Sequence, residues 1–173
     1  MELSDNEVAL RPLRDDDNVV LTELANNRKI ADNLRDVFPH PYTVENAIFF
    51  INLTKQESPQ LTFAIEYKGG LCGIAGLLKH ADIYRNTAEI GYWIGEPYWN
   101  KGIATRAVKL LTEYGLDHLN YARLQTGIFE YNTSSMKVLE KCGYRLEGVF
   151  QKSLTKHGRL WDEYRYGIIN PKA

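Results

Sequence analysis

The chain has 173 residues, of which 44% are hydrophobic and 25% are charged, so its composition is that of an ordinary globular protein. Its formal net charge of −1 gives no electrostatic reason for binding to nucleic acid or to an anionic membrane. No apolar run approaches the roughly 20 residues of a membrane-spanning helix, and the N-terminus shows no signal peptide. We therefore expect one cytoplasmic domain over residues 1–173, with neither nucleic acid nor membrane as a partner.

The cysteines and histidines give no sign of a metal or of a disulfide. Cys72 and Cys142 lie far apart and form no CxxC pair, as expected of reduced, mostly buried thiols. The four histidines show no metal-ligand spacing. We therefore expect no metal.

The first elements combine a strand with two helices. Val8–Arg14 is typical of a short strand, and the acidic run Asp15–Asp17 then caps a helix to about Asn27, although three acids would also suit a basic partner. Thr43 caps a second helix, with asparagine where a capping box prefers Glu or Gln. The helical period puts the following residues on its core side: Ala47, Ile48, Phe50, Ile51 and Thr54.

A hairpin and a third strand occupy the middle of the chain. Residues 61–67 alternate as a strand, Lys68–Gly70 is typical of a hairpin turn, and residues 71–78 are predicted to be the return strand. After a polar connection, Ala88–Ile94 is predicted to be the next strand.

The last third of the chain contains one more helix between strands. Ala122–Tyr131 is predicted to be a strand, and a short helix from Asn132 runs to Lys141, where Cys142–Gly143 ends it. Residues 144–152 and 161–169 then read as two strands. The order of elements indicates an α/β chain, antiparallel in its first half, with helices crossing between strands in the second.

The stretch from Glu96 to Ala107 carries the clearest functional signal. It joins a predicted strand to a helix start, where unpaired backbone N–H groups favour an anion such as phosphate. Gly102 and Ala104 keep bulky side chains away from that spot. An ordinary strand-to-helix connection would have the same free N–H groups. Neither the G-x-G-x-x-G nor the G-x-x-x-x-G-K-[ST] nucleotide motif is present.

Taken together, these motifs resemble the GNAT superfamily of N-acetyltransferases, and within it the RimJ/RimL type. The resemblance covers nearly the whole chain and is carried by Leu10–Leu13, Glu89–Tyr92, Trp99–Ala107, Asn132–Ser135, Lys141–Tyr144, Glu147–Val149, His157–Arg159 and Asp162. It implies an α/β (α+β) fold: a mixed, largely antiparallel central sheet of about six to seven strands, flanked by about four helices, with splayed central strands.

The resemblance also implies acetyl-CoA as cosubstrate. The residues matching the family's pyrophosphate loop are Asn100, Lys101, Gly102, Ile103, Ala104 and Thr105, and the backbone of Trp93 and Ile94 would pair with the pantetheine arm. Trp99 and Asn100 depart from the residues usual at their positions.

Beyond the loop, the family places the thioester between two splayed strands, here Ala88–Ile94 and Ala122–Tyr131. Asn132 and Ser135 match its N-x-x-S motif, which contacts the cofactor, while helix capping by Asn132 explains the same residue.

Amine acetylation needs a neutral amine, a donor for the oxyanion and a proton for the thiolate. Glu89 is the candidate general base, although a salt-bridged carboxylate at the rim explains it equally well. The resemblance makes Ser135 the candidate thiolate donor, with Tyr131 as a fallback. The backbone N–H of Ile94 or a neighbour could stabilise the oxyanion. Some relatives have a glutamate base on the penultimate strand, but this sequence has no matching carboxylate near Leu154.

The expected reaction is acetyl transfer from acetyl-CoA to a primary amine, with the N-terminal α-amine of a (ribosomal) protein as the acceptor that the resemblance suggests. The alternatives are a small-molecule amine (a polyamine, amino acid or antibiotic) and a non-catalytic acyl-CoA-binding module. Residues 32–42, 79–86 and 157–161 are the candidate acceptor pocket, and Phe38–Tyr42 would form a wall of it or a stiff connector. Both a monomer and a homodimer are compatible with the sequence.

Overall fold

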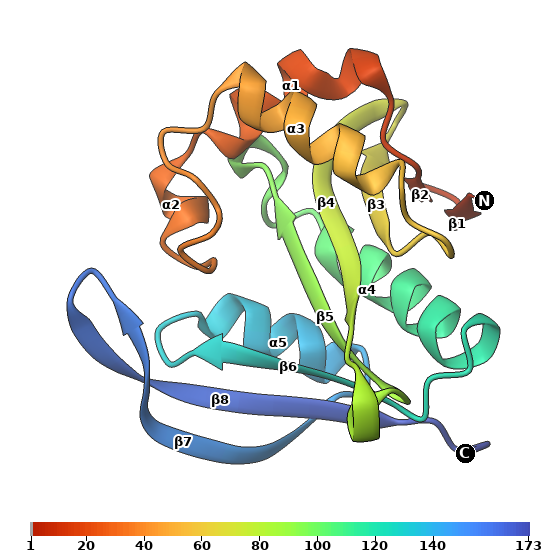
Figure 1. The fold of residues 1–173 in the computed structure, drawn as a ribbon, viewed down its shortest axis with the longest axis vertical. Coiled ribbons are helices and arrows are strands. Elements are labelled where there is room, and N and C mark those ends of the chain that lie inside the picture. The colour runs from red at the N-terminus through yellow and green to blue at the C-terminus, as the bar shows by residue number, and fades with distance from the viewer. Residues whose placement is uncertain (1) are drawn as a thin grey trace. The chain divides into compact units, whose positions relative to one another are not determined.

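The computed structural model describes residues 2–173. Within it the chain packs into two compact units (Figure 1). The first holds the chain up to Gly76 together with Tyr92–Leu111, and the second holds Leu77–Gly91 with Thr112–Ala173. One acetyltransferase domain over residues 1–173 stays a prediction.

The strand order is β1-β2-β3-β4-β5-β6-β8-β7, and the pairings described for residues 2–173 are antiparallel except for the parallel pair β5–β6. The prediction of a mixed, largely antiparallel α/β fold is confirmed. The eight strands and five α-helices of the described chain exceed the expected numbers. Two elements were not predicted, β1 (Leu3–Ser4) and α2 (Arg28–Ala31), because both are too short to show a periodic pattern.

Strands and helices of the first unit follow the predicted order. Its sheet consists of β2 (Val8–Arg11), β3 (Thr62–Tyr67) and the part of β4 (Gly70–Lys79) up to Gly76, with β1 beside β2. Lys68 and Gly69 form the hairpin turn, both at positive φ, as a two-residue turn of this hand requires.

The helices of this unit are α1 (Asn18–Ala25), α2 and α3 (Val44–Thr54). Thr43 caps α3 as predicted, and Asn46 completes the capping box.

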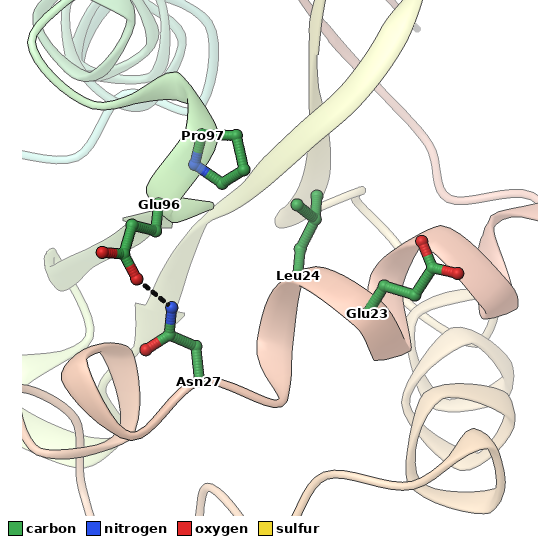
Figure 2. A pocket seen from close by; sticks show the side chains of 5 residues that line it. All are labelled: Glu23, Leu24, Asn27, Glu96 and Pro97. Carbon is green, nitrogen blue, oxygen red and sulfur yellow. Dashed lines mark hydrogen bonds between the residues drawn. The ribbon is translucent and has the colours of Figure 1, made fainter.

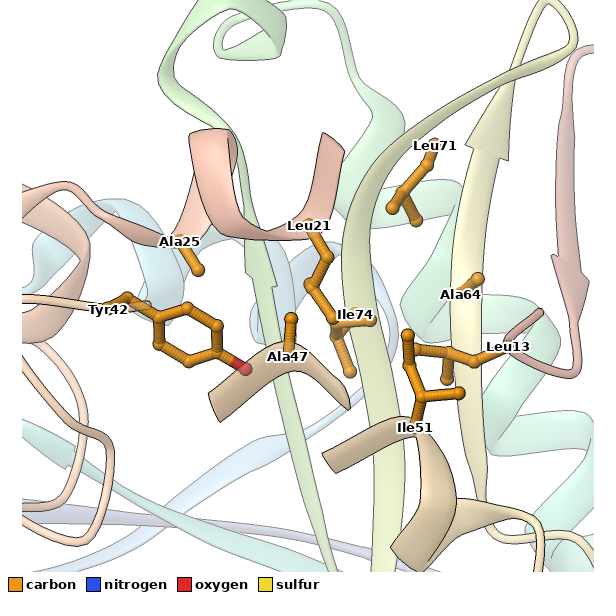
Figure 3. Close-up of a cluster of buried hydrophobic side chains, with 9 residues drawn as sticks. All are labelled: Leu13, Leu21, Ala25, Tyr42, Ala47, Ile51, Ala64, Leu71 and Ile74. Carbon is orange, nitrogen blue, oxygen red and sulfur yellow. The ribbon is translucent and has the colours of Figure 1, made fainter. Parts of the chain in front are cut away.

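The core of the first unit lies between these helices and the sheet (Figure 3). It consists of Leu13, Leu21, Ala25, Tyr42, Ala47, Ile51, Ala64, Leu71 and Ile74, with Phe38, Phe50 and Trp93 packed against it. Burying each large side chain contributes about 1.5–3 kcal/mol. The placement of Ile48 in the core was wrong, since its side chain is 45% exposed. The buried row of α3 follows Ala47, Ile51 and Thr54, which turns Ile48 outward.

The acidic run Asp15–Asp17 does more than cap a helix. It forms a 3₁₀ turn before α1, and the carboxylate of Asp17 accepts two hydrogen bonds from the buried guanidinium of Arg11, both of 2.8 Å. Arg11 also donates to Glu66 at 2.6 Å. The predicted helix to Asn27 ends at Ala25, and Asn27 caps α2 instead.

The second unit contains the remaining strands. They are β6 (Arg123–Phe129), β7 (Arg145–Lys156), β8 (Arg159–Ile169) and the start of β5 (Thr87–Ile94). The turn His157–Gly158 lets β7 and β8 extend beyond their predicted ends.

The helix α5 (Thr133–Lys141) of this unit ends before Gly143, which has a φ of 88°. Its buried residues Met136 and Leu139 belong to the core, as do Leu124 and Tyr166 of the sheet. The buried hydroxyl of Tyr144 is hydrogen-bonded to Thr112 at 2.9 Å.

The strands β5 and β6 run side by side only briefly. Their described pairing covers three residues, from Thr87 opposite Arg123 to Glu89 opposite Gln125. Beyond this point β6 stays paired with β8 as far as Phe129. This short pairing is what the predicted splaying of the central strands requires.

Candidate functional site

The loop before α4 (Ile103–Glu113) has the backbone shape of an anion-binding turn. Asn100 and Gly102 both adopt left-handed conformations, with φ of 61° and 75°. Asparagine is among the few residues other than glycine that adopt the left-handed conformation readily, which explains its presence at position 100. A Cβ atom built on Gly102 would have no atom within 4 Å, so the space in front of this residue is open to a ligand. The loop thus fits the expected diphosphate.

The start of α4 provides the donors for such a group. The first bond of the helical ladder runs from the N–H of Arg106 to the carbonyl of Gly102, at 3.2 Å. The N–H groups that precede it have no carbonyl one turn earlier in the helix. The side chain of Arg106 pairs with Asp5 and Glu7, at 3.0 and 2.8 Å. An attraction for an anion at this point would therefore come from the backbone, which is the binding mode predicted for Asn100 to Thr105.

Trp99 is the second departure from the family pattern, and its role is structural. Its indole Nε1 donates to the carbonyl of Ile94 at 2.7 Å, which ties the loop back to the end of β5. The carbonyl of Trp93 lies against Gly73, where a Cβ atom would come within 2.2 Å of it. The carbonyl of Ile94 thus accepts a hydrogen bond from Trp99, and the carbonyl of Trp93 packs against Gly73. The predicted stabilisation of the oxyanion concerns a different group, the N–H of Ile94.

Replacing Trp99 by phenylalanine should loosen the loop while keeping the ring. We expect acetyl-CoA binding to weaken by about 5- to 10-fold, the value of one hydrogen bond of about 1 kcal/mol. Isothermal titration with acetyl-CoA measures this change. Unchanged affinity would show that the bond to Ile94 does not hold the loop in its binding conformation.

A carboxylate clamp fixes the other end of the loop (Figure 2). Glu96 accepts a hydrogen bond from Asn27 at 2.7 Å and one from Lys29. These hydrogen bonds, first that from Lys29 and then that from Asn27, hold the pKa of Glu96 below its usual range. The ammonium of Lys101 donates to the carbonyl of Pro97 at 2.9 Å. Side chains from the loop and from the start of α2 therefore brace the loop.

The hollow drawn in Figure 2 lies beside this clamp. It is lined by Glu23, Leu24, Asn27, Glu96 and Pro97. Leu24 packs closely on Gly95, where a Cβ atom would approach it to 2.7 Å. We assign this hollow no ligand.

The predicted acceptor wall also lies in the first unit. The ring of Phe38 lies 5.2 Å from that of Tyr42 and 6.1 Å from that of Trp93, measured between centroids. Burial raises the pKa of Tyr42 to about 12, so its hydroxyl stays neutral. The loop thus packs as an aromatic wall, and its contact with an acceptor stays a prediction.

The catalytic candidates belong to the second unit. Glu89 is half-buried on β5 and lies opposite Gln125. The side chain of Asn132 accepts a hydrogen bond from the N–H of Ser135 at 3.2 Å, so Asn132 does cap α5. Tyr131 is 38% exposed and stacks on Phe129. The roles of Glu89, Ser135 and Asn132 in catalysis or cofactor binding stay predictions.

Glu163 on β8 is a further carboxylate that was not predicted from the sequence. The glutamate base that some relatives have on the penultimate strand has no counterpart near Leu154, whereas Glu163 lies on the last strand, opposite Phe129 of β6. Alternation along a strand would have assigned Glu163 a face, but only the register of three strands shows what shares that face.

No group of three potential metal ligands occurs among residues 2–173. None of the helices described there is long and apolar enough to cross a bilayer. Both cysteines are free, and burial raises the pKa of Cys72 to about 12, so this thiol is unreactive.

Comparisons with known proteins agree with these features. A family model of the acetyltransferase (GNAT) domain matches residues 7–145. The uncharacterized N-acetyltransferase YnaD of Bacillus subtilis is 32% identical over 128 residues, covering 74% of this chain and 75% of YnaD. The spermidine N(1)-acetyltransferase of Escherichia coli is 29% identical over 172 residues, covering 96% and 88%.

Two solved structures extend the comparison. The microcin C7 self-immunity acetyltransferase MccE, solved with acetyl-CoA and AMP, superposes with a TM-score of 0.81 at 27% identity, covering 95% of this chain and 93% of MccE. RimL, the ribosomal L7/L12 α-N-protein acetyltransferase in complex with coenzyme A, gives a TM-score of 0.86 over 98% of both chains. Its identity of 17% shows a common fold alone.

Proposed function

The chain belongs to the acetyltransferase (GNAT) family and is an acetyl-CoA-dependent N-acetyltransferase, and we propose that the amine it acetylates is the N-terminal α-amine of a protein. The observation that carries the cofactor half of this proposal is the braced loop from Trp99 to α4, with open space at Gly102. Acetyl-CoA supplies the activated acyl group there, and the amides of Asn100 to Thr105 would hold its diphosphate.

The free energy of deprotonation supports an α-amine as acceptor. Making an α-amine neutral at pH 7 costs about 1 kcal/mol, against about 4–5 kcal/mol for a lysine-like amine. An α-amine therefore demands less of the base, and we assign Glu89 as a base that accepts a proton from the acceptor nitrogen. Ser135 would return a proton to the departing thiolate, and the N–H of Ile94 would stabilise the oxyanion.

A polyamine is the second candidate acceptor. The likeness to the E. coli spermidine N(1)-acetyltransferase extends over 96% of this chain and favours this reading. A non-catalytic acyl-CoA-binding module would share the loop but need no base, so binding and turnover separate the three possibilities.

The test begins with the wild-type chain. Acetyl-CoA at 100 times its Kd should raise the free energy of unfolding by about 2.7 kcal/mol. Thiol release is then followed with a peptide that has a free N-terminus, with the same peptide blocked at its N-terminus, and with spermidine. Turnover of the free peptide alone supports the proposal, whereas turnover of spermidine alone favours the polyamine reading. Acetyl-CoA binding without turnover of any acceptor would leave the binding module.

Replacing the catalytic candidates should uncouple binding from turnover. We expect Glu89→Gln and Ser135→Ala each to lower kcat by about 100-fold, the typical contribution of one acid–base group. The affinity for acetyl-CoA in titration should stay within about twofold, because the loop residues are untouched. If neither change, alone or combined, slows turnover, the assignments of Glu89 and Ser135 are wrong.

A further inference from the structure

The sheet of the second unit has one buried and one open face. Ala88, Leu124 and Thr126 are buried on one side, whereas the residues between them point to the other. Glu89 lies opposite Gln125, and the next rows on this open face pair Gly127 with Arg165 and Phe129 with Glu163. Directly paired residues project to the same side. The candidate base Glu89 and the missed carboxylate Glu163 therefore share the open face.

Glu163 is held down against β6. A Cβ atom built on Gly127 would lie 1.8 Å from Oε1 of Glu163, so the carboxylate occupies the space that a side chain at this position would fill. Its side chain is only 15% exposed. Gly127 lies two residues beyond Gln125, where the described pairing of β5 with β6 ends. The carboxylate of Glu163 thus lies over the first part of β6 beyond its described pairing with β5.

The hydrogen bonds of Glu163 leave it room for another donor. Arg165 donates to Oε1 at 3.1 Å, and the hydroxyl of Ser153 donates to Oε2 at 3.1 Å. An ionised carboxylate offers about four acceptor positions, so these two bonds fix the group without filling it.

Aromatic rings border the same part of the open face. Phe129 stacks on Tyr131 with centroids 5.1 Å apart, and Trp161 meets Tyr131 edge-on at 4.8 Å. Trp161 precedes Glu163 by two residues and projects to the same side. Arg165 shares the charge of Glu163, and the guanidinium of Arg159 lies 4.4 Å from the centre of the Trp161 ring, so a cation is already accommodated there. The unfilled acceptor positions of Glu163, with the rings of Phe129 and Tyr131 beside them, suit an alkylammonium group.

We propose that Glu163 binds the amino group of the acceptor and takes its first proton. This inference rests on the proposed function. One proton passes from the ammonium to the carboxylate of Glu163, which leaves a lone pair on nitrogen. That pair forms the C–N bond to the thioester carbon while the C–S bond breaks, and the second N–H proton balances the thiolate as thiol. Glu89 is then the base that accepts the second proton of the nitrogen.

Two substitutions at different sites test the carboxylate. Glu163→Gln removes its charge, and Gly127→Ala displaces it while keeping the charge. The backbone of Gly127 has no positive φ, and the atom that must move is the end of a flexible side chain, so this variant should fold. We expect each change to lower kcat/KM for the acceptor by about 10- to 100-fold, mainly through KM. Because both act on one group, the double variant should be no worse than Glu163→Gln.

Glu147→Gln is the matched control. Like Glu163, its carboxylate lies over a strand glycine, here Gly167 of β8, where a built Cβ atom would come within 2.7 Å of it. Unlike Glu163, both of its oxygens accept hydrogen bonds from one arginine, Arg123. This variant should keep the wild-type KM. All variants are assayed with the free N-terminal peptide and with spermidine, and their Kd for acetyl-CoA is titrated in parallel.

The outcomes separate the two proposals. Wild-type chain that binds no acetyl-CoA contradicts the proposed function itself. Intact acetyl-CoA binding with an unchanged acceptor KM in Glu163→Gln, or equal losses in Glu147→Gln, overturns the role of Glu163. Acetyl-CoA binding without turnover of either amine contradicts both proposals. Additive losses in the double variant would show that Gly127→Ala acts elsewhere, and would equally contradict the inference.

Discussion

Replacing Gly102 by valine is expected to weaken acetyl-CoA binding by about 100-fold. The residue adopts a φ of 75°, where a β-branched side chain is strained, so the loop must change shape. Its Cβ would also project into the open space that a diphosphate needs. Losing two hydrogen bonds of about 1.5 kcal/mol each accounts for a factor of this size. Isothermal titration with acetyl-CoA gives the change directly.

Gly69→Val is the control for backbone strain. Gly69 lies in the same unit, has a φ of 79°, and has likewise no atom within 4 Å of a built Cβ. Both variants should lose a similar 1–2 kcal/mol or so of unfolding free energy, but only Gly102→Val should lose affinity. Comparable affinity in the two variants would show that the loop before α4 is not the diphosphate site.

The parts of the fold that the sequence predicted depend on local chemistry. The turn at Lys68–Gly69, the cap at Thr43 and the end of α5 before Gly143 each follow from the residues that form them. The loop before α4 belongs to this group, because its glycine and the start of a helix are neighbours in sequence. Its two departures are explained only by the structure, through the indole hydrogen bond of Trp99 and the positive φ of Asn100.

What the sequence did not predict depends on distant residues. The clamp on Glu96 comes from Asn27, 69 residues earlier in the chain. The position of Glu163 over Gly127 requires the register of β6 and β8. A pattern of alternation tells which residues share a face of one strand, but it does not tell which strand lies beside it. The candidate carboxylates were therefore found one by one, and their common face was not.

Asp17 shows the same limit within a short segment. Its place at a helix start agrees with capping, and it does accept a hydrogen bond from the N–H of Arg14 at 2.7 Å. Its larger role is to neutralise Arg11, which is only 5% exposed. That burial results from the packing of β2 against β3, where Glu66 supplies a second carboxylate.

Replacing Arg11 by methionine should therefore destabilise the chain strongly. The change leaves Asp17, 7% exposed, and Glu66 without their cation, and breaking a buried pair from one side costs about 3–5 kcal/mol. Urea unfolding at pH 7 measures the loss. The double variant Arg11→Met with Asp17→Asn is the control, because it also removes the stranded charge and should recover part of the stability. No recovery would mean that lost packing, rather than an unpaired carboxylate, causes the effect.

The pH dependence of that loss distinguishes charge from packing more directly. Burial raises the pKa of Asp17, but the hydrogen bonds from Arg11 and the N–H of Arg14 outweigh it, so the folded pKa lies below the ordinary 3.8. A lowered folded pKa stabilises the fold above about pH 4, and this contribution is lost as the pH falls through the folded value. Without Arg11 the pKa of Asp17 should rise, so the cost of Arg11→Met should shrink between pH 7 and pH 3. A cost that stays constant over this range would contradict the assignment of Arg11 and Asp17 as the ion pair that stabilises the first unit.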